Sequence, residues 1–338
     1  EVPVGITAYS GMCFDPEGKQ LLLFGGGHSD YFGNEVWSWH VPTRRWKRLT
    51  EPTPPEVIRG ATYNWDETPG MLPELRLPVS RHTYDSVEWI EHLGRMYAAG
   101  SSTWSSRDAV PLWDVYPRGA TGANKDKGWN PGDAWLFDTR TAEWSYSKAP
   151  EELVDGGVTC AYAARSKLLI RWDRRGTFLY DVERDVWTPV ESRLAPEPAI
   201  HRTMTYDSRR DCCYLLGGDH KGSDKIWRFD VAKSEWSVLE VKGGSPTLFD
   251  GPGCAYDAAA DVLVTYGKTG LWVFDLNTAA WLENPAAEGP QPPREGEYGG
   301  LVELYGRMKY DPVHKLVLAV LADYKHGVQV WGYRHARQ

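Results

Sequence analysis

Residues 202–238 read RTMTYDSRRDCCYLLGGDHKGSDKIWRFDVAKSEWSV, and this stretch decides the fold because the chain repeats its pattern. A first segment carries the aromatic Tyr206, and a second, apolar segment ends eleven residues later. A third segment contains the step Trp227-Arg-Phe229, and Trp236 follows Phe229 by seven residues. Alternate residues of a strand share a face, so the two aromatics of the step point the same way. The pattern predicts four short strands joined by tight turns.

The same spacing occurs six times along the chain. The first-segment aromatics are Phe14, Trp89, Tyr162, Tyr206, Tyr256 and Tyr310. The aromatic steps end at Trp39, Phe137, Tyr180, Phe229, Phe274 and Tyr333. A small four-stranded antiparallel sheet cannot bury both faces by itself, and radial stacking of such sheets solves this problem. We therefore predict an all-β chain, a single β-propeller domain over residues 1–338 with six four-stranded blades, seven being the alternative.

The sixth repeat leaves the closure of the ring open. Each of the first five repeats has a tryptophan seven residues after its aromatic step, but in the sixth this position falls beyond Gln338. Its fourth strand must therefore come from the N-terminus, where residues 2–8 are the candidate, or be missing.

The repeat resembles the kelch family. The resemblance rests on the double glycines at 25–26 and 217–218, on the Asn34-Glu-Val-Trp37 step, and on the tryptophan that follows the aromatic step. It implies a kelch-type β-propeller with the architecture of the central domain of galactose oxidase. It does not imply a function, because propellers carry many.

Composition narrows the functional classes. The formal net charge of −8 and the absence of a basic cluster argue against nucleic acid as a partner, and no apolar run is long enough to span a membrane. The five cysteines form no CxxC pair and are interpreted as structural. We expect a monomer that acts on a carbohydrate or another small molecule. The chain starts at Glu1 rather than Met, which fits a processed mature protein and a trimmed chain equally well. We expect a secreted or periplasmic protein, with a cytoplasmic one as the alternative.

Strand order assigns every loop to one of two faces, and the longest loops share one face. This face receives the loops between the second and third strands and the connections between repeats, including residues 47–88, 101–133 and 282–305. Loops of this length without structure of their own are usually functional or disordered. Five of the nine histidines belong to the same face: His28, His82, His201, His220 and His326.

Histidine, tyrosine and arginine on one face suit proton abstraction next to a carboxylate. A guanidinium neutralises the acid, a neutral His or Tyr takes the α proton, and a second one protonates the leaving oxygen. Propeller-shaped polysaccharide lyases use this β-elimination chemistry, and the present chain resembles them in shape and residue types. The candidate catalytic residues are His28, Tyr31, His82, His201 and Arg202. The candidate substrate-binding residues are Arg81, Trp104, Trp113, Trp129, His220, Lys221, Glu297 and Tyr298.

Two other classes stay open. The chain is alternatively a non-catalytic kelch module that binds a protein or a glycan. A further hypothesis is a metal-dependent hydrolase or oxidase. In it, histidines of separate blades hold a divalent metal, and Asp30, Asp250 or Glu297 provides an additional ligand. No HExxH motif is present, and the neighbouring Tyr-His pair wanted by a copper radical site is absent.

Overall fold

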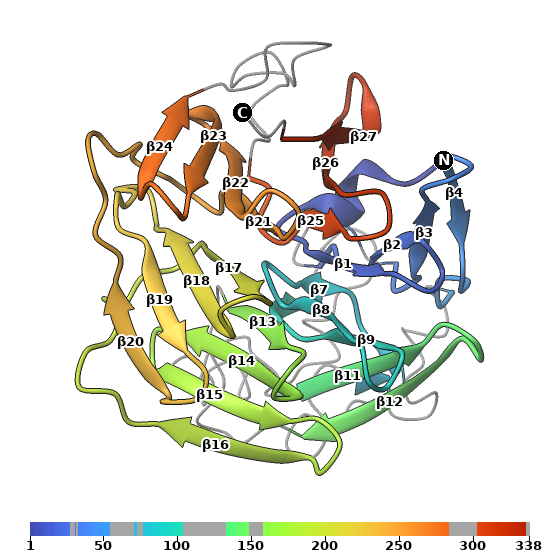
Figure 1. Cartoon of the computed structure of the whole chain (residues 1–338). Coiled ribbons are helices and arrows are strands. Elements are labelled where there is room, and N and C mark those ends of the chain that lie inside the picture. The colour runs from blue at the N-terminus through green and yellow to red at the C-terminus, as the bar shows by residue number, and fades with distance from the viewer. Residues whose placement is uncertain are drawn as a thin grey trace.

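The computed structural model describes residues 1–27, 31, 33–54, 71–72, 77–103, 133–148, 158–283 and 303–335. Nearly all regular elements in these ranges are strands, apart from the short 3-10 helix η1 (Val4–Thr7). Figure 1 shows antiparallel sheets set around a common axis, which confirms the prediction of an all-β propeller with six blades. No helix among the described residues is long and apolar enough to cross a membrane.

The blades follow the chain in order, with the first strand of each innermost. Blade 1 has β1 (Met12–Asp15), β2 (Gln20–Leu23), β3 (Trp37–His40) and β4 (Arg45–Arg48). Blade 2 has β8 (Val87–Ile90), β9 (Arg95–Ala98), β11 (Asp133–Asp138) and β12 (Glu143–Lys148). Blade 3 has β13 (Thr159–Ala163), β14 (Leu168–Asp173), β15 (Gly176–Asp181) and β16 (Val186–Val190). Blade 4 has β17 (Arg202–Asp207), β18 (Cys212–Gly217), β19 (Trp227–Asp230) and β20 (Glu235–Val238). Blade 5 has β21 (Gly253–Asp257), β22 (Val262–Gly267), β23 (Gly270–Asp275) and β24 (Ala280–Glu283).

Blade 6 has three strands among the described residues: β25 (Met308–Asp311), β26 (Leu316–Asp323) and β27 (Gly327–Tyr333). The idea that residues 2–8 supply its fourth strand is wrong, because they form η1 and its flanks. This segment instead fills the seam between the last and first blades, where Val2 and Ile6 pack with Leu318 and Val320. The ring therefore closes through side-chain packing and the contact of β25 with β1.

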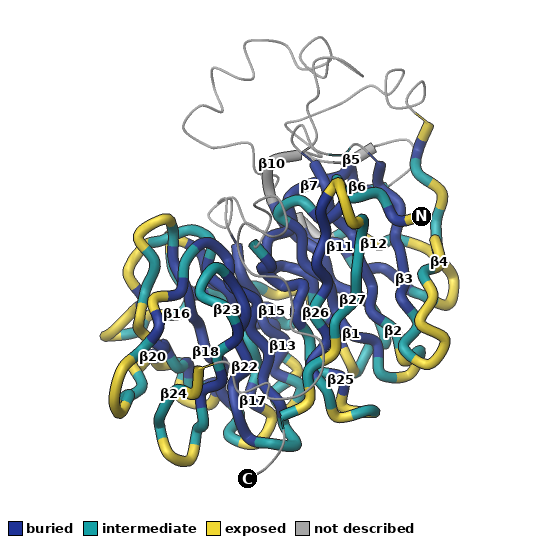
Figure 2. The backbone as a smooth tube through the Cα atoms, turned by 90° about the horizontal axis from the view of Figure 1, so that it is seen from above, coloured by how far each residue is buried: buried dark blue, intermediate teal, exposed yellow. Residues whose placement is uncertain are grey.

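Two small sheets add to one end of the propeller. They are β5 (Met71–Leu72) with β6 (Leu77–Pro78), and β7 (Arg81–His82) with β10 (Ser101–Thr103). Figure 2 places β6 and β7 at the same end of the molecule. β7 carries Arg81 and His82, which are buried.

The seven-residue spacing has a simple structural basis. In the antiparallel register of β15 and β16, Tyr180 lies directly opposite Trp187, and their rings stack 4.0 Å apart. In blade 4, Phe229 and Trp236 are cross-strand partners with ring centroids 5.0 Å apart. Cross-strand aromatic pairs of this kind stabilise a sheet beyond the area they bury.

The five cysteines lie buried in the inner strands of the blades, and none forms a disulfide. Burial raises the pKa of Cys13, Cys160 and Cys213 well above the ordinary thiol value. The thiols are consequently protonated and behave as small apolar groups, as the sequence predicts.

Charged side chains occupy the axis between the inner strands. Lys309 of β25 contacts Glu88 of β8 across the axis, with its Nζ 2.5 Å from Oε1. Asp85 lies 4.0 Å from the same Nζ, and its other oxygen accepts hydrogen bonds from Thr159 Oγ1 (2.5 Å) and from the Met204 amide (2.6 Å). This group therefore connects blades 2, 3, 4 and 6 at the centre.

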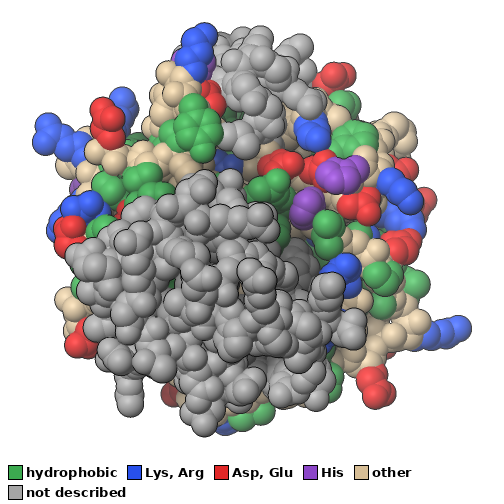
Figure 3. Space-filling view, turned by 180° about the vertical axis from the view of Figure 1, so that it is seen from behind, with side chains coloured by type: hydrophobic (Ala, Val, Ile, Leu, Met, Phe, Trp, Pro, Cys, Tyr) green, Lys and Arg blue, Asp and Glu red, His purple; other side chains and the backbone are tan. Residues whose placement is uncertain are grey.

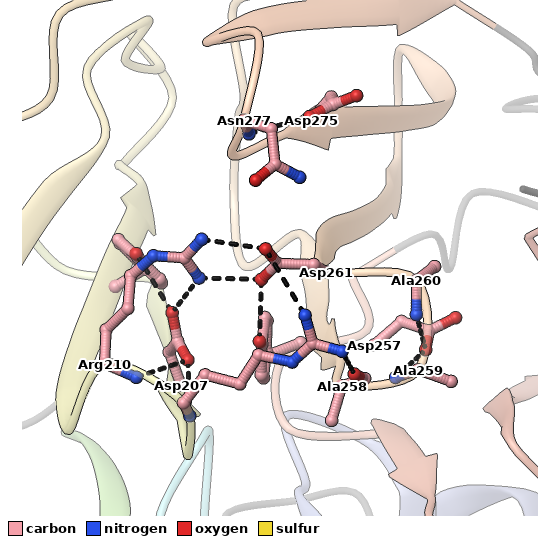
Figure 4. A network of polar contacts seen from close by, with 12 residues as sticks. Asp207, Arg210, Asp257, Ala258, Ala259, Ala260, Asp261, Asp275 and Asn277 are labelled. Atoms are coloured by element: carbon pink, nitrogen blue, oxygen red, sulfur yellow. Dashed lines mark hydrogen bonds and ion pairs between the residues drawn. The ribbon is translucent and has the colours of Figure 1, made fainter.

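A second set of charges joins neighbouring blades at the opposite end, in the turns that follow the inner strands (Figure 4). Arg210 donates to Asp207 in its own turn (2.8 Å) and to both carboxylate oxygens of Asp261 in blade 5 (2.7 and 2.8 Å). The Tyr256 hydroxyl also donates to Asp261, at 2.8 Å. The bond from Arg210 is the main cause that lowers the pKa of Asp261 to about 2.

Asp261→Asn is expected to lower the free energy of unfolding by about 2 kcal/mol, because a bidentate, charge-assisted pair is replaced by one neutral acceptor. The folded-state pKa of Asp261 is depressed, so its contribution is present above about pH 4 and is lost as the pH falls towards about 2. Urea unfolding at several pH values checks this, with Asp275→Asn as the matched control because Asp275 accepts only from the backbone amides of its own turn in the described contacts. A constant difference between wild type and Asp261→Asn down to acid pH would contradict the prediction.

Candidate functional site

One position of the repeat places side chains on the axis. It lies five residues before the first-strand aromatic and is occupied by Tyr9, Tyr84, His201, Gly251 and Tyr305 in blades 1, 2, 4, 5 and 6. The Tyr305 ring centroid lies 5.5 Å from those of Tyr84 and His201. The Tyr9 centroid is 5.9 Å from that of Tyr305 and 6.0 Å from that of Tyr84. Side chains from four blades can contact one another in this way only at the centre of the ring.

The backbone at this position is left-handed, although four of the five residues named there are not glycine. The φ angles are 46° at Tyr9, 47° at Tyr84, 60° at His201 and 45° at Tyr305. Apart from Asp250, the other described non-glycine residues with positive φ lie in turns between strands of one blade. An aromatic residue in this region costs roughly 1 kcal/mol or more, and such strain is concentrated at functional sites.

Neighbouring blades are hydrogen-bonded at the same position. The Tyr84 amide donates to the Tyr9 carbonyl (2.6 Å), the Gly251 amide to the His201 carbonyl (2.8 Å), and the Tyr305 amide to the Gly251 carbonyl (2.8 Å). Gly251 itself cannot carry a side chain, because a Cβ atom there would lie 2.3 Å from the ring of Tyr305. The ring of blades thus fixes the directions in which the axial side chains project.

His82 of β7 completes the group. Its ring stacks on Tyr9 with centroids 4.6 Å apart and meets the edge of Tyr84 at 5.7 Å. We call Tyr9, His82, Tyr84, His201 and Tyr305 the axial cluster. It combines three phenol hydroxyls and two imidazoles, which are groups that exchange protons in catalysis.

A buried carboxylate organises one side of the axial cluster. Asp250 lies in the connection between blades 4 and 5, and its side chain is 1% exposed. Its Oδ1 is 3.3 Å from His201 Nδ1, whereas its Oδ2 is 3.0 Å from both His220 Nδ1 and Lys268 Nζ. Burial raises the pKa of Asp250, but the bonds from Lys268, His220 and His201 outweigh it, so the net shift is downward. Asp250 is therefore ionised at neutral pH.

His201 is the group best placed to accept a proton. Burial lowers its pKa below the ordinary value of 6.5, and this outweighs the opposite effect of Asp250. A neutral His201 that donates through Nδ1 to Asp250 keeps Nε2 unprotonated, as a general base requires. The tautomer is thus set by the carboxylate behind it.

The side chains around Asp250 differ in their exposure. The side chain of His220 is 82% exposed, that of Lys268 31% and that of His201 12%. Tyr9 is half-buried, while Tyr305 is fully buried and its hydroxyl has no hydrogen-bond partner in the described ranges. Figure 3 shows histidine side chains beside acidic and hydrophobic ones on the face of the molecule seen from behind.

The structure brings together some of the catalytic candidates chosen from sequence. His82 and His201 both lie against Tyr9. Arg202 follows His201, but its guanidinium lies over Trp172 of blade 3, 5.1 Å from the ring centroid. Tyr31 donates its hydroxyl to Glu35 at 2.5 Å in blade 1. His28 lies outside the described residues.

The substrate-binding candidates are placed as follows. His220 contacts Asp250, and its neighbour Lys221 is exposed, with its amide donating to Asp219. Arg81 is fully buried on β7 and its Nε donates to the Val79 carbonyl. Trp104, Trp113, Trp129, Glu297 and Tyr298 lie outside the described residues.

Sequence reasoning missed most of the axial cluster. Tyr9, Tyr84 and Tyr305 were not chosen, nor was Lys268, and Asp250 was considered only as a metal ligand. The signal was available in the repeat, because the three tyrosines and His201 occupy one aligned position. The sequence gives no such indication for Asp250 and Lys268, because the residues that they contact come from other segments of the chain.

A metal centre has no support in the part of the chain that the structure describes. No three His, Cys, Asp or Glu side chains in those ranges are grouped so that they could hold an ion. Asp250, one of the ligands considered from sequence, is engaged by Lys268 and two histidines instead.

Comparison with known proteins adds no relative from which a role could be transferred. No model of a protein family matches the chain, and no curated protein is similar to it. The axial cluster must therefore be interpreted from its own geometry.

Proposed function

We propose that this propeller is a carbohydrate-active enzyme, a polysaccharide lyase that cleaves an acidic glycan by β-elimination at the axial cluster. One observation carries the proposal: Tyr84 and Tyr305, from separate blades, lie against His201, whose Nδ1 contacts the carboxylate of Asp250. The aromatic rings also suit the apolar faces of sugar rings.

We further propose that the chain is a divergent member of the kelch family. The double glycines and the regular tryptophans support this assignment, and both features are compatible with the blade geometry. Kelch membership concerns the scaffold alone, so the proposed activity rests on the site.

In the proposed reaction, Nε2 of His201 accepts the proton from the carbon next to the uronate carboxyl group. The electron pair of this C–H bond forms a carbon–carbon double bond as the bond to the glycosidic oxygen breaks. The hydroxyl of Tyr9 gives a proton to that oxygen, and exchange with water restores both residues. Lys268 supplies positive charge, and His220 an imidazole that can form a hydrogen bond, where the substrate carboxyl group becomes enolate-like.

The experiment is an assay of the purified protein on polymers of galacturonate, glucuronate and mannuronate, alongside a neutral glycan. The expected result is an unsaturated uronate product, recognised by its ultraviolet absorbance and by a new non-reducing end in mass spectra. New reducing ends without unsaturation would indicate hydrolysis instead. Binding of a glycan or protein with no cleavage of any polymer would favour the non-catalytic kelch module.

A further inference from the structure

A carboxylate of the chain lies between two cations at the boundary of blades 3 and 4. Glu197, in the connection from β16 to β17, is hydrogen-bonded to Nζ of Lys225. Its Oε2 lies 3.7 Å from Nη2 of Arg202, and its backbone carbonyl accepts from the same nitrogen at 3.1 Å. The side chains of Glu197 and Lys225 are 54% and 46% exposed, so this contact is open to solvent.

Each of the two cations lies on a tryptophan ring. Arg202 lies over Trp172 at 5.1 Å, and Lys225 lies over Trp227 at 5.7 Å. Both tryptophans belong to one apolar cluster between the two blades. Their rings hold the cations in fixed positions, because cation–π contacts add to the Coulomb attraction.

The group has more donors than acceptors. Nε and Nη1 of Arg202 and Nε1 of Trp227 are buried and have no hydrogen-bond partner among the residues that the structure describes. Arg202 itself is 3% exposed. Buried donors without acceptors cost free energy, so an additional acceptor at this group would be stabilising.

This group adjoins the axial cluster. Arg202 is the residue after His201, and Lys225 lies in the same β18–β19 connection as His220. A chain of sugars whose reacting unit contacts His201 and His220 would meet Lys225 and Glu197 if it left the axis along the β18–β19 connection.

We propose that Arg202 and Lys225 form a subsite for the carboxylate of a neighbouring uronate unit, and that Glu197 occupies this subsite until the substrate displaces it. The inference deepens the proposed function and rests on it only for the identity of the ligand. Displacement exchanges one carboxylate for another on the same two cations, and it turns the mobile end of Glu197 towards solvent. The subsite thus selects for glycans that are acidic at consecutive units.

The test measures binding, which does not require cleavage. Trisaccharides of galacturonate, glucuronate and mannuronate and their carboxyl-reduced counterparts are titrated calorimetrically into His201→Asn protein. Glu197→Gln is expected to tighten binding of an acidic trisaccharide about threefold or more, because it removes the competing charge. Lys225→Gln is expected to weaken it about fivefold, and both variants should leave the reduced trisaccharides unaffected.

Arg202→Gln is expected to weaken binding more than about tenfold, but it also removes a buried contact, so Lys225→Gln keeps the test valid if that variant does not fold. Lys233→Gln is the matched control, since Lys233 is an exposed lysine paired with Asp230 in a turn at the other end of the same blade. Unchanged affinities in Glu197→Gln and Lys225→Gln, or no binding of any acidic trisaccharide, would overturn the subsite. Cleavage by protein with His201 intact, together with unchanged affinities, would leave the lyase proposal standing. Arg202-dependent binding, with no cleavage by protein with His201 intact, would leave only the subsite.

Discussion

His201→Asn is expected to lower the rate of uronate cleavage by about 10²- to 10⁴-fold, the usual contribution of a positioned general base. Asparagine is the suitable replacement because His201 has a φ of 60°, and asparagine tolerates this left-handed conformation better than alanine does. The variant should therefore keep its fold and its affinity for substrate. Initial rates of formation of the unsaturated product check the expected loss of activity. Circular dichroism spectra of the same samples check that the fold is retained.

The pH dependence gives an independent readout of the same group. The pKa of His201 is lowered by burial, so the imidazole is neutral at and above neutral pH. We expect kcat/KM of the wild type to fall as the pH drops below the ordinary histidine value and to be level above it until a second group titrates. The acid limb should be lost in His201→Asn. Retention of the same limb in the variant would mean that another residue acts as the base.

His314→Asn is the matched control. His314 contacts Asp311 through Nδ1 at 2.6 Å, the same kind of pair as His201 with Asp250, but it lies in the turn between β25 and β26, away from the axial cluster. Loss of activity in His201→Asn alone assigns the effect to the axial cluster. Equal activity in both variants and the wild type would remove His201 from the mechanism.

The architecture could be predicted from the sequence because a propeller is a local pattern repeated. Every blade except the second completes its described strands within roughly forty residues. The pairing of Phe229 with Trp236 follows from a seven-residue hairpin spacing. The alignment that reveals the blades also fixes which residues reach the axis. His201 was found from chemistry alone, although its aligned partners Tyr9, Tyr84 and Tyr305 were not considered.

The rest of the site depends on contacts that no local pattern records. The carboxylate of Asp250 meets Lys268 and His220 because the connections of blades 4 and 5 lie side by side, and this depends on loop conformation. Arg202 looked catalytic because it follows His201, but successive residues entering a strand point in different directions. Its side chain therefore packs on Trp172.

Lys309→Met is expected to lower the free energy of unfolding by about 3 kcal/mol, the largest stability effect of any single change proposed. Blade 6 has no fourth strand among the described residues. In those residues no strand from the N-terminal part of the chain pairs with blade 6 to join it to blade 1. The contact of Lys309 with Glu88, reaching from blade 6 to blade 2, supplies part of that function at the axis. Removing the ammonium leaves Glu88 and Asp85 as uncompensated carboxylates in a poorly solvated place.

The sign of the pH dependence distinguishes this cause from a general packing defect. Burial raises the pKa of Asp85 from 3.8 to about 7, which the nearby Lys309 opposes, and burial also raises the pKa of Glu88. An acid whose folded-state pKa is raised favours folding when protonated, so its stabilising effect is present at about pH 4 and is lost as the pH rises to about 7. Without Lys309 both pKa values rise further, so the difference in melting temperature between wild type and Lys309→Met should be small at about pH 5 and large at about pH 8.

Lys309→Met combined with Glu88→Gln should recover part of the loss, and Lys233→Met, at an exposed lysine, should have no effect. A loss in Lys309→Met that is the same at both pH values would instead assign the role of Lys309 to its aliphatic stem.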